Sequence, residues 1–167
     1  MAIEKKIAFI GGGNMAEALI RGILAANTAR FDQLMVADVS EARLVHLRNV
    51  HGITIKKNNR EAVAAADIIM VCVKPQVMDA VFAEIALETG PAKLVISIAA
   101  GITIGRIEAA LAPGTRVVRV MPNTPALVLA GAAGLSRGAS ATEKDMAISR
   151  EIFGSCGRAV EVDEKLM

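Results

Sequence analysis

The sequence predicts an α/β fold in which a doubly wound, mostly parallel sheet carries helices on both faces. Three observations support this prediction. Apolar segments with strand character alternate with segments of helical periodicity along most of the 167 residues. The strand segments lack polar alternation, as expected for strands buried on both faces of a parallel sheet. Three glycines, Gly11 to Gly13, join the first strand directly to the first helix.

Length and composition fit one globular domain with a substantial core. The chain has 167 residues, of which 53% are hydrophobic, and its 19 basic and 17 acidic residues are interspersed. Nucleic acid is not an expected partner, because phosphate-tracking proteins need a basic stripe. No apolar run approaches the ~18 residues of a membrane span. We therefore expect a cytoplasmic protein without membrane contact.

The segment from Ile7 to Ala16 has the G-x-G-x-x-A spacing of a dinucleotide-binding fingerprint. Gly11 suits the sharp turn, Gly13 lets a pyrophosphate approach the backbone, and Ala16 lets the helix pack closely on the strand. The amide groups at the start of the helix would face an anion at the positive end of the helix dipole. The spacing predicts a Rossmann-type fold; a turn whose glycines serve chain reversal alone is the other interpretation.

A second strand, Leu34 to Ala37, ends at Asp38. In Rossmann folds an acidic residue about 20 residues beyond the fingerprint binds the adenosine ribose hydroxyls. Ser40 is expected to cap the following helix. Arg43, one turn into that helix, either reaches a 2′-phosphate or lies on the exposed helix face with Arg48.

The alternation continues to the end of the chain. Further strands are predicted at Ile53 to Ile55, Ile68 to Val73, Leu94 to Ile98, Arg116 to Met121, Gly131 to Gly138 and Ala159 to Val162. Helices are predicted over Glu61 to Ala65, capped by Asn58 or Asn59, over Val77 to Ile85, from Thr103, and from a capping box of Thr142 and Asp145.

Ligands of open parallel sheets bind outside the carboxyl ends of the strands. The segments leaving those ends are expected on one rim: Gly11 to Met15, Asp38 to Ser40, Cys72 to Gln76, Ala99 to Gly101 and Met121 to Pro125. Small residues leave room there for a flat ligand, and prolines stiffen the walls. Lys74 either faces a phosphate or carboxylate or is simply solvated. Asn123 offers an amide in a nearly fixed position, or forms an Asx turn.

No catalytic set or metal site is visible in the sequence. Cys72 and Cys156 have no CxxC partner and are expected in the core. His46 and His51 fall in a charged helical stretch typical of a solvated face. A nicotinamide enzyme need supply little beyond orientation, because its cofactor carries the hydride chemistry.

Four segments together resemble the bacterial pyrroline-5-carboxylate reductases, and the resemblance covers all 167 residues. They are Ile10-Gly-Gly-Gly-Asn-Met15, Val73-Lys-Pro-Gln76, Ser97-Ile-Ala-Ala-Gly101 and Arg119-Val-Met-Pro-Asn-Thr-Pro125. The resemblance implies reduction of the C=N bond of Δ1-pyrroline-5-carboxylate by NAD(P)H, which gives L-proline. A β-hydroxyacid dehydrogenase is another interpretation, because it shares the glycine turn and the chain order. The Pro-Asn-Thr-Pro segment would not be expected in that class.

The resemblance also implies the site residues. The pyrophosphate would be held by Ile10, Gly11, Gly12, Gly13, Asn14 and Met15, with Asn59 near the adenosine half. The nicotinamide half would be lined by Cys72, Val73, Lys74, Pro75, Ile98, Ala99 and Ala100, and Asn123 would lie near the substrate. The family favours NADP(H), whereas Asp38 would repel a 2′-phosphate and makes NAD(H) possible. If Asp38 turns outward, Ser40 and Arg43 would accommodate the phosphate.

By the same resemblance, residues 1–162 form the dinucleotide-binding domain, and residues 163–167 start a helix that connects to a helical dimerisation domain. That further domain would form the homo-oligomer and hold the substrate carboxylate, so this chain alone is expected to be inactive. The catalytic residue stays unassigned, and the proton would come from water or from a hydroxyl of that domain. A different class of protein, an NAD(H)-sensing regulatory module, is the alternative.

Overall fold

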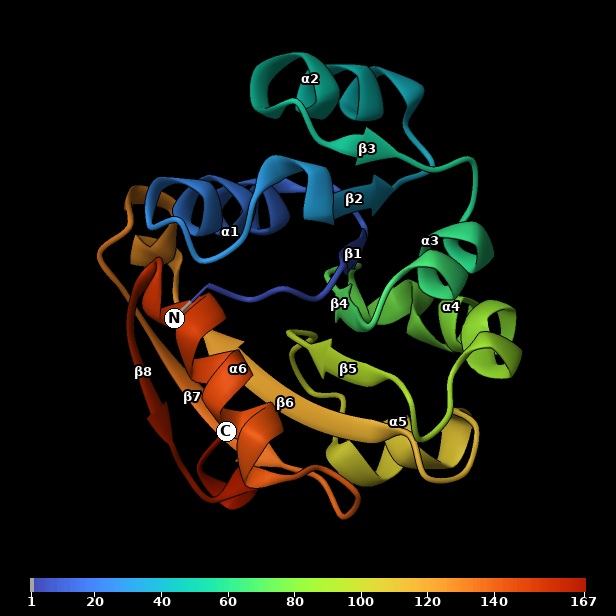
Figure 1. Cartoon of the computed structure of the whole chain (residues 1–167). Helices are drawn as coiled ribbons and strands as arrows, with labels where there is room; N and C mark the ends of the chain where they lie inside the picture. Colours follow the sequence, from blue (N-terminus) through green and yellow to red (C-terminus); the bar gives the residue numbers. More distant parts are fainter. Residues whose placement is uncertain (1) are drawn as a thin grey trace.

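A computed structural model describes residues 2–167, which form an eight-stranded sheet between two layers of helices (Figure 1). The strands are β1 (Ile7–Ile10), β2 (Leu34–Ala37), β3 (Thr54–Ile55), β4 (Ile68–Val71), β5 (Leu94–Ser97), β6 (Arg116–Pro122), β7 (Gly131–Arg137) and β8 (Gly157–Glu161). The α-helices are α1 (Asn14–Ala25), α2 (Glu41–His51), α3 (Asn59–Ala65), α4 (Met78–Ile85), α5 (Ile104–Ala110) and α6 (Glu143–Gly154). The predicted fold class is confirmed.

The sheet order is β3-β2-β1-β4-β5-β6-β7-β8, so the first strand of the chain lies inside the sheet between β2 and β4. All neighbouring pairs from β3 to β6 are parallel. The chain then reverses: β7 runs antiparallel to β6, and β8 pairs parallel with β7. The carboxyl ends of β1, β2, β4, β5 and β6 therefore lie along one rim, as the sequence predicts.

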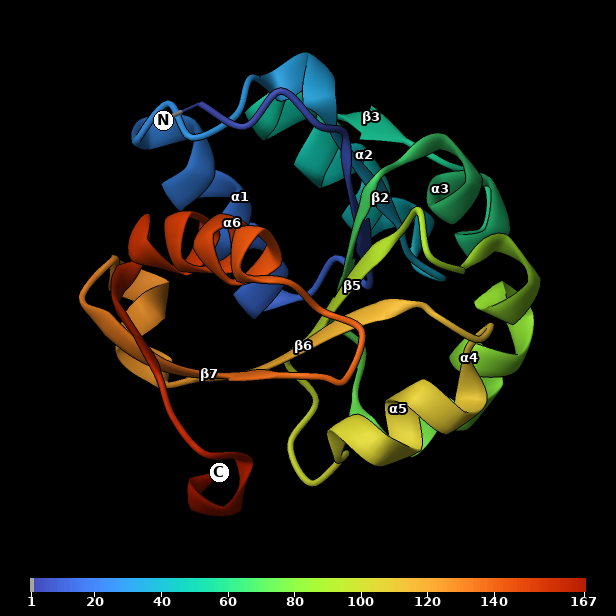
Figure 2. The ribbon, with the colours of Figure 1, turned by 60° about the horizontal axis from the view of Figure 1, so that its bottom comes forward.

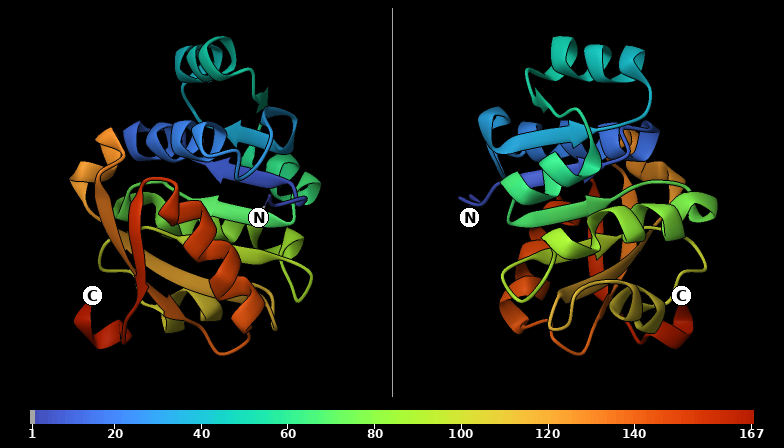
Figure 3. Two further views of the ribbon diagram at one scale, coloured as in Figure 1. Left: turned by 60° about the vertical axis from the view of Figure 1, so that its left-hand side comes forward. Right: turned by 90° about the vertical axis from the view of Figure 1, so that its right-hand side faces the viewer.

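Two apolar clusters hold the helices on the sheet. The first joins one side of the strands to α1, α2 and α6, and the second joins the other side to α3, α4 and α5 (Figure 2). Alternate strand residues enter the two clusters, as Phe9 and Ala8 of β1 illustrate. In the left view of Figure 3, α1 and α6 lie in front of the strands. In the right view, α3, α4 and α5 lie in front of them.

Side-chain caps begin the helices where the sequence predicts them. Ser40 caps α2 by accepting from the Arg43 N–H at 3.3 Å, and Thr142 and Asp145 form the capping box of α6. Asn58, rather than Asn59, caps α3 through the Glu61 N–H at 2.9 Å. These caps supply acceptors for backbone N–H groups that have no partner inside their helices.

The predicted strand from Ile68 to Val73 is too long, because β4 ends at Val71. Cys72 still donates its N–H to the Ile10 oxygen at 2.8 Å, and Pro75 then opens a short 3-10 turn. Pro75 has no N–H to continue a sheet ladder. The chain therefore leaves the sheet beside the glycine turn.

The last described residues are tied to the sheet by a partly buried ion pair. Residues Glu164–Leu166 form a 3-10 turn. Glu164 Oε1 accepts from Arg119 Nη1 at 2.8 Å and from the Ile104 N–H at 2.7 Å. The Arg119 side chain is only 5% exposed and that of Glu164 is 31% exposed, so a partly exposed carboxylate compensates the buried guanidinium, whose Nε has no hydrogen-bond partner within residues 2–167.

Gly22 allows α1 to pass close to the end of α6. A Cβ at this position would lie 2.5 Å from Cys156 Sγ and 2.9 Å from the Ser155 oxygen. We expect Gly22→Ala to lower the free energy of unfolding by about 1–3 kcal/mol, because a packed interior accommodates an extra methyl only by shifting. Urea denaturation measures the change.

Gly105→Ala is the matched control for that prediction. Gly105 is also helical, and a Cβ there would have no heavy atom within 4 Å. It should raise stability by about 0.5–1 kcal/mol through helix propensity alone. Equal effects of the two substitutions would contradict close packing at Gly22.

Candidate functional site

The glycine turn after β1 depends on Gly11 for its shape. Gly11 has a φ of +93°, and its N–H donates to the Ala37 oxygen at 2.9 Å. A Cβ on Gly11 would lie 2.9 Å from Val73 Cγ1 and 3.1 Å from the Cys72 carbonyl carbon. Only glycine combines this backbone conformation with so close an approach to the chain after β4. The predicted role of Gly11 in the sharp turn is consistent with this geometry.

Gly13 meets a different constraint. Its φ of −71° and ψ of −171° are open to any residue, and a Cβ there would meet no heavy atom within 4 Å. Gly13 is the N-cap of α1, a helix of 12 residues, and both Gly13 and Asn14 are exposed. Open space therefore adjoins backbone amides at the positive end of a helix, an arrangement that suits an anion. Ala16, one turn further, is buried where α1 packs on the sheet.

Asp38 is turned toward the glycine turn. Its Oδ2 accepts from the Gly12 N–H at 2.7 Å, and its Oδ1 accepts from the Ser40 N–H at 2.8 Å. The side chain thus links the end of β2 to the turn after β1, at the position where Rossmann folds bind the adenosine ribose. The outward orientation considered from the sequence is not the one that the structure adopts.

Arg43 lies across the glycine turn rather than on the exposed face of α2. Its Nε donates to the Gly12 oxygen, and its Nη2 donates to the Gly13 oxygen at 3.3 Å and to Glu17 Oε2. The first turn of α2 is therefore held against the first turn of α1.

Two histidines complete a cluster that sequence reasoning missed. His46 Nε2 and His51 Nε2 lie 2.9 and 3.1 Å from Glu17 Oε1, and the His51 side chain is only 10% exposed. The predicted solvated position of His51 is therefore wrong. Burial acts to raise the pKa of Glu17, but hydrogen bonds with His46, His51 and Arg43 outweigh it and lower that pKa from 4.5 to about 2. No sequence spacing signals this cluster, because it depends on how α1 and α2 are placed against each other.

The Glu17 cluster should make stability depend on pH in acid. The ionised carboxylate is favoured in the folded state, so its contribution is complete above about pH 4.5 and disappears as the pH falls toward 2. Glu17→Gln should therefore be less stable than the unaltered chain at pH 7, and the difference should shrink below pH 4.5. Urea unfolding at several pH values measures it. Glu41→Gln, at an exposed position of α2, should show no such convergence.

The predicted nicotinamide segments leave neighbouring strands. Cys72 to Pro75 follow β4, and Ile98 to Ala100 follow β5, which is paired with β4. Ala99 is buried, whereas Lys74 and Ala100 are exposed. Cys72 is partly buried against the first apolar cluster, and burial raises the pKa of its thiol to about 12. Cys156 is a core residue, as expected.

The two asparagines singled out from the sequence have structural partners. Asn59 Nδ2 donates to Glu84 Oε2 at 2.8 Å, which links α3 to α4. Asn123 pairs with Ala132: its Oδ1 accepts the Ala132 N–H at 2.8 Å, and its own N–H donates to the Ala132 oxygen at 3.1 Å. Asn123 is exposed, and its side-chain oxygen anchors the reversal between β6 and β7.

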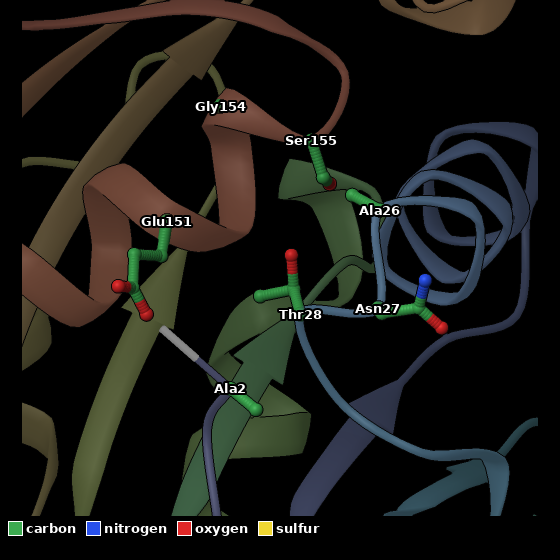
Figure 4. A pocket seen from close by; sticks show the side chains of 7 residues that line it. All are labelled: Ala2, Ala26, Asn27, Thr28, Glu151, Gly154 and Ser155. Carbon is green, nitrogen blue, oxygen red and sulfur yellow. The ribbon is translucent and has the colours of Figure 1, made fainter.

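A pocket of about 340 Å³ lies at the other end of α1 from the glycine turn (Figure 4). It is lined by Ala2, Ala26, Asn27, Thr28, Glu151, Gly154 and Ser155. It does not belong to the rim formed by the carboxyl ends of the parallel strands. In residues 2–167, no group of three or more His, Cys, Asp or Glu residues could hold a metal ion. None of the helices in that part of the chain is long and apolar enough to cross a bilayer.

The central parallel strands, the glycine turn after β1 and the acidic residue after β2 define the Rossmann class of α/β folds. Residues 6–101 match the family model described as NADP oxidoreductase coenzyme F420-dependent. The chain belongs to this family.

Similar proteins share a more specific name. The pyrroline-5-carboxylate reductase of Methanosarcina acetivorans is 42% identical over 164 residues, which is 98% of this chain and 61% of that protein. The structure of a pyrroline-5-carboxylate reductase from Coxiella burnetii superposes with a TM-score of 0.92 at 31% identity, over 98% of this chain and 60% of that one. The Plasmodium falciparum pyrroline carboxylate reductase, solved with NADP bound, gives 0.88 at 32% identity, over 99% and 60%. This chain thus spans about three fifths of the relatives that it matches.

Proposed function

We propose that this chain is the cofactor-binding part of a pyrroline-5-carboxylate reductase, which reduces the C=N bond of Δ1-pyrroline-5-carboxylate to give L-proline. The open space beside Gly13, at the amino end of α1, is the observation that carries the cofactor assignment. The similarity of nearly the whole chain to pyrroline-5-carboxylate reductases supports the choice of reaction.

The residues of the rim would bind and orient the cofactor. Ile10 to Met15 would hold the pyrophosphate against the first turn of α1, Asp38 would bind the adenosine ribose, and Asn59 would lie on the adenosine side. Cys72 to Pro75 and Ile98 to Ala100 would line the nicotinamide, which in its reduced form would supply the hydride. Asn123, anchored by Ala132, keeps the wall next to the substrate in place.

The helical domain, the dimer and the cytoplasmic location belong to the same proposal. Residues 1–162 form the dinucleotide-binding domain, and residues 163–167 lead toward a helical domain that holds the substrate carboxylate and makes the homodimer. In this proposal the imine nitrogen takes its proton from water or from a hydroxyl of that domain.

Calorimetric titration of the 167-residue chain tests the cofactor half. NADH or NADPH should bind saturably, whereas pyrroline-5-carboxylate alone should not. A folded chain that binds neither dinucleotide would contradict the proposal.

A chimera tests the reaction itself. The chain is joined to the remaining part of the Methanosarcina acetivorans relative, and oxidation of NAD(P)H is followed with and without pyrroline-5-carboxylate. Turnover that depends on the imine is expected. A folded chimera that binds dinucleotide but does not turn over would favour the NAD(H)-sensing module instead.

A further inference from the structure

We propose that Glu17 determines which cofactor this chain prefers: its carboxylate neutralises Arg43 beside the glycine turn and leaves Asp38 to select NADH over NADPH. The inference rests on the proposed function, because it concerns the same cofactor site. Asp38 favours NADH and Arg43 favours NADPH, so the sequence alone leaves the cofactor preference open. Glu17 would decide between them.

The two cofactors differ at one position, the 2′-oxygen of the adenosine ribose. NADH has a hydroxyl there, which a carboxylate binds by accepting a hydrogen bond, and NADPH has a phosphate, which an arginine binds. A carboxylate repels the phosphate, so the outcome depends on which side chain presents its charge to the ribose.

Asp38 is fixed in the orientation that suits NADH. Both of its carboxylate oxygens accept backbone N–H groups, from Gly12 at 2.7 Å and from Ser40 at 2.8 Å. Turning it outward to admit a phosphate would break both bonds. A carboxylate oxygen has a second lone pair, so Asp38 can still accept from a ribose hydroxyl.

Arg43 is already engaged inside the protein. Its Nε and Nη2 donate to the carbonyl oxygens of the glycine turn, and Nη2 also donates to Glu17. The side chains of Arg43 and Glu17 are 24% and 22% exposed, so their attraction is partly shielded from solvent. A 2′-phosphate would have to compete with a carboxylate that is already in place.

His46 and His51 keep Glu17 in that place. Both imidazoles lie within hydrogen-bonding distance of Oε1, and Arg43 binds Oε2. The two carboxylate oxygens are thus divided between partners on the same helix, α2. Glu17 cannot rotate toward solvent without losing partners on both oxygens.

Calorimetric titration with NADH and NADPH tests the inference in the 167-residue chain. The unaltered chain should bind NADH more tightly than NADPH, and tighter NADPH binding would overturn the inference without a variant being made. Glu17→Gln removes the charge that neutralises Arg43. It should lower the ratio of the NADPH dissociation constant to the NADH dissociation constant by about tenfold, as expected when the phosphate forms one additional charge-assisted hydrogen bond with Arg43.

Two further variants separate this hydrogen bond from general charge effects. Glu41→Gln removes an equal charge from an exposed position in the first turn of α2 and should leave the ratio unchanged. Equal shifts in both variants would overturn the role of Glu17. Arg43→Ala should weaken NADPH binding more strongly in the Glu17→Gln background than in the unaltered chain; equal losses would overturn the coupling. If a folded, unaltered chain bound neither cofactor, the proposed function itself would fail.

Discussion

Gly13→Val is expected to fold with a loss of at most about 1 kcal/mol, since valine is a poorer N-cap than glycine, and to bind both dinucleotides at least about a hundredfold more weakly, a loss of roughly 2.7 kcal/mol. The backbone of Gly13 is extended, and a Cβ built there would meet no heavy atom within 4 Å, so the backbone and the space at Cβ admit a side chain. The same side chain would fill the position where a pyrophosphate approaches the first turn of α1. Calorimetry measures the binding, and urea denaturation measures the stability.

Gly11→Ala is the matched comparison. Its positive φ and the 2.9 Å approach of a Cβ to Val73 Cγ1 predict a loss of stability of about 1–3 kcal/mol before any ligand is added. The two glycines thus separate a requirement of the fold from a requirement of the ligand. Unimpaired binding by Gly13→Val would show that the open space is not the pyrophosphate site.

Glu164→Ala is expected to lower the free energy of unfolding by about 3–5 kcal/mol, because it leaves a buried guanidinium without its carboxylate. Glu164 is the carboxylate that pairs with Arg119, whose side chain is 5% exposed, and it also accepts the first N–H of α5. Urea denaturation measures the loss.

Glu161→Ala removes a neighbouring carboxylate from an exposed pair with Arg150, 3.5 Å apart, and should change stability by less than about 1 kcal/mol. Combining Glu164→Ala with Arg119→Met removes both charges and should recover much of the loss. A small effect of Glu164→Ala alone would mean that solvent reaches Arg119 once the 3-10 turn loosens.

The sequence was sufficient for the parallel part of the fold because each of its signals is local. Continuous apolar runs such as Ile68 to Val71 predict buried strands, and Ser40 and Thr142 cap the helices that they are expected to cap. The reversal at β7 has no comparable signal. At this reversal Asn123 and Ala132 hydrogen-bond to each other although they are 9 residues apart, and no local pattern in the sequence predicts that pairing.

The residues of the candidate site also fall into those that a local motif locates and those that depend on packing between helices. Gly11, Gly13 and Asp38 follow from a spacing along one strand, turn and helix, so the motif locates them directly. The hydrogen bonds of Glu17 with Arg43, His46 and His51 join two helices, and the sequence interval between them carries no pattern. Whether Arg43 faces solvent or the glycine turn is decided by that packing, so the cofactor preference needs the structure.

The central position of β1 also limits how the chain can reach its folded state. Ile7–Ile10, which are synthesised before both of their partner strands, pair on one side with β2 and on the other with Ile68–Val71. The pairing of β1 with β4 closes a long loop. The chain loses the conformational entropy of that loop before the new contacts stabilise the fold. The first strand therefore waits with one edge unpaired until β4 emerges, and at about 5–20 residues per second that wait lasts several seconds during synthesis.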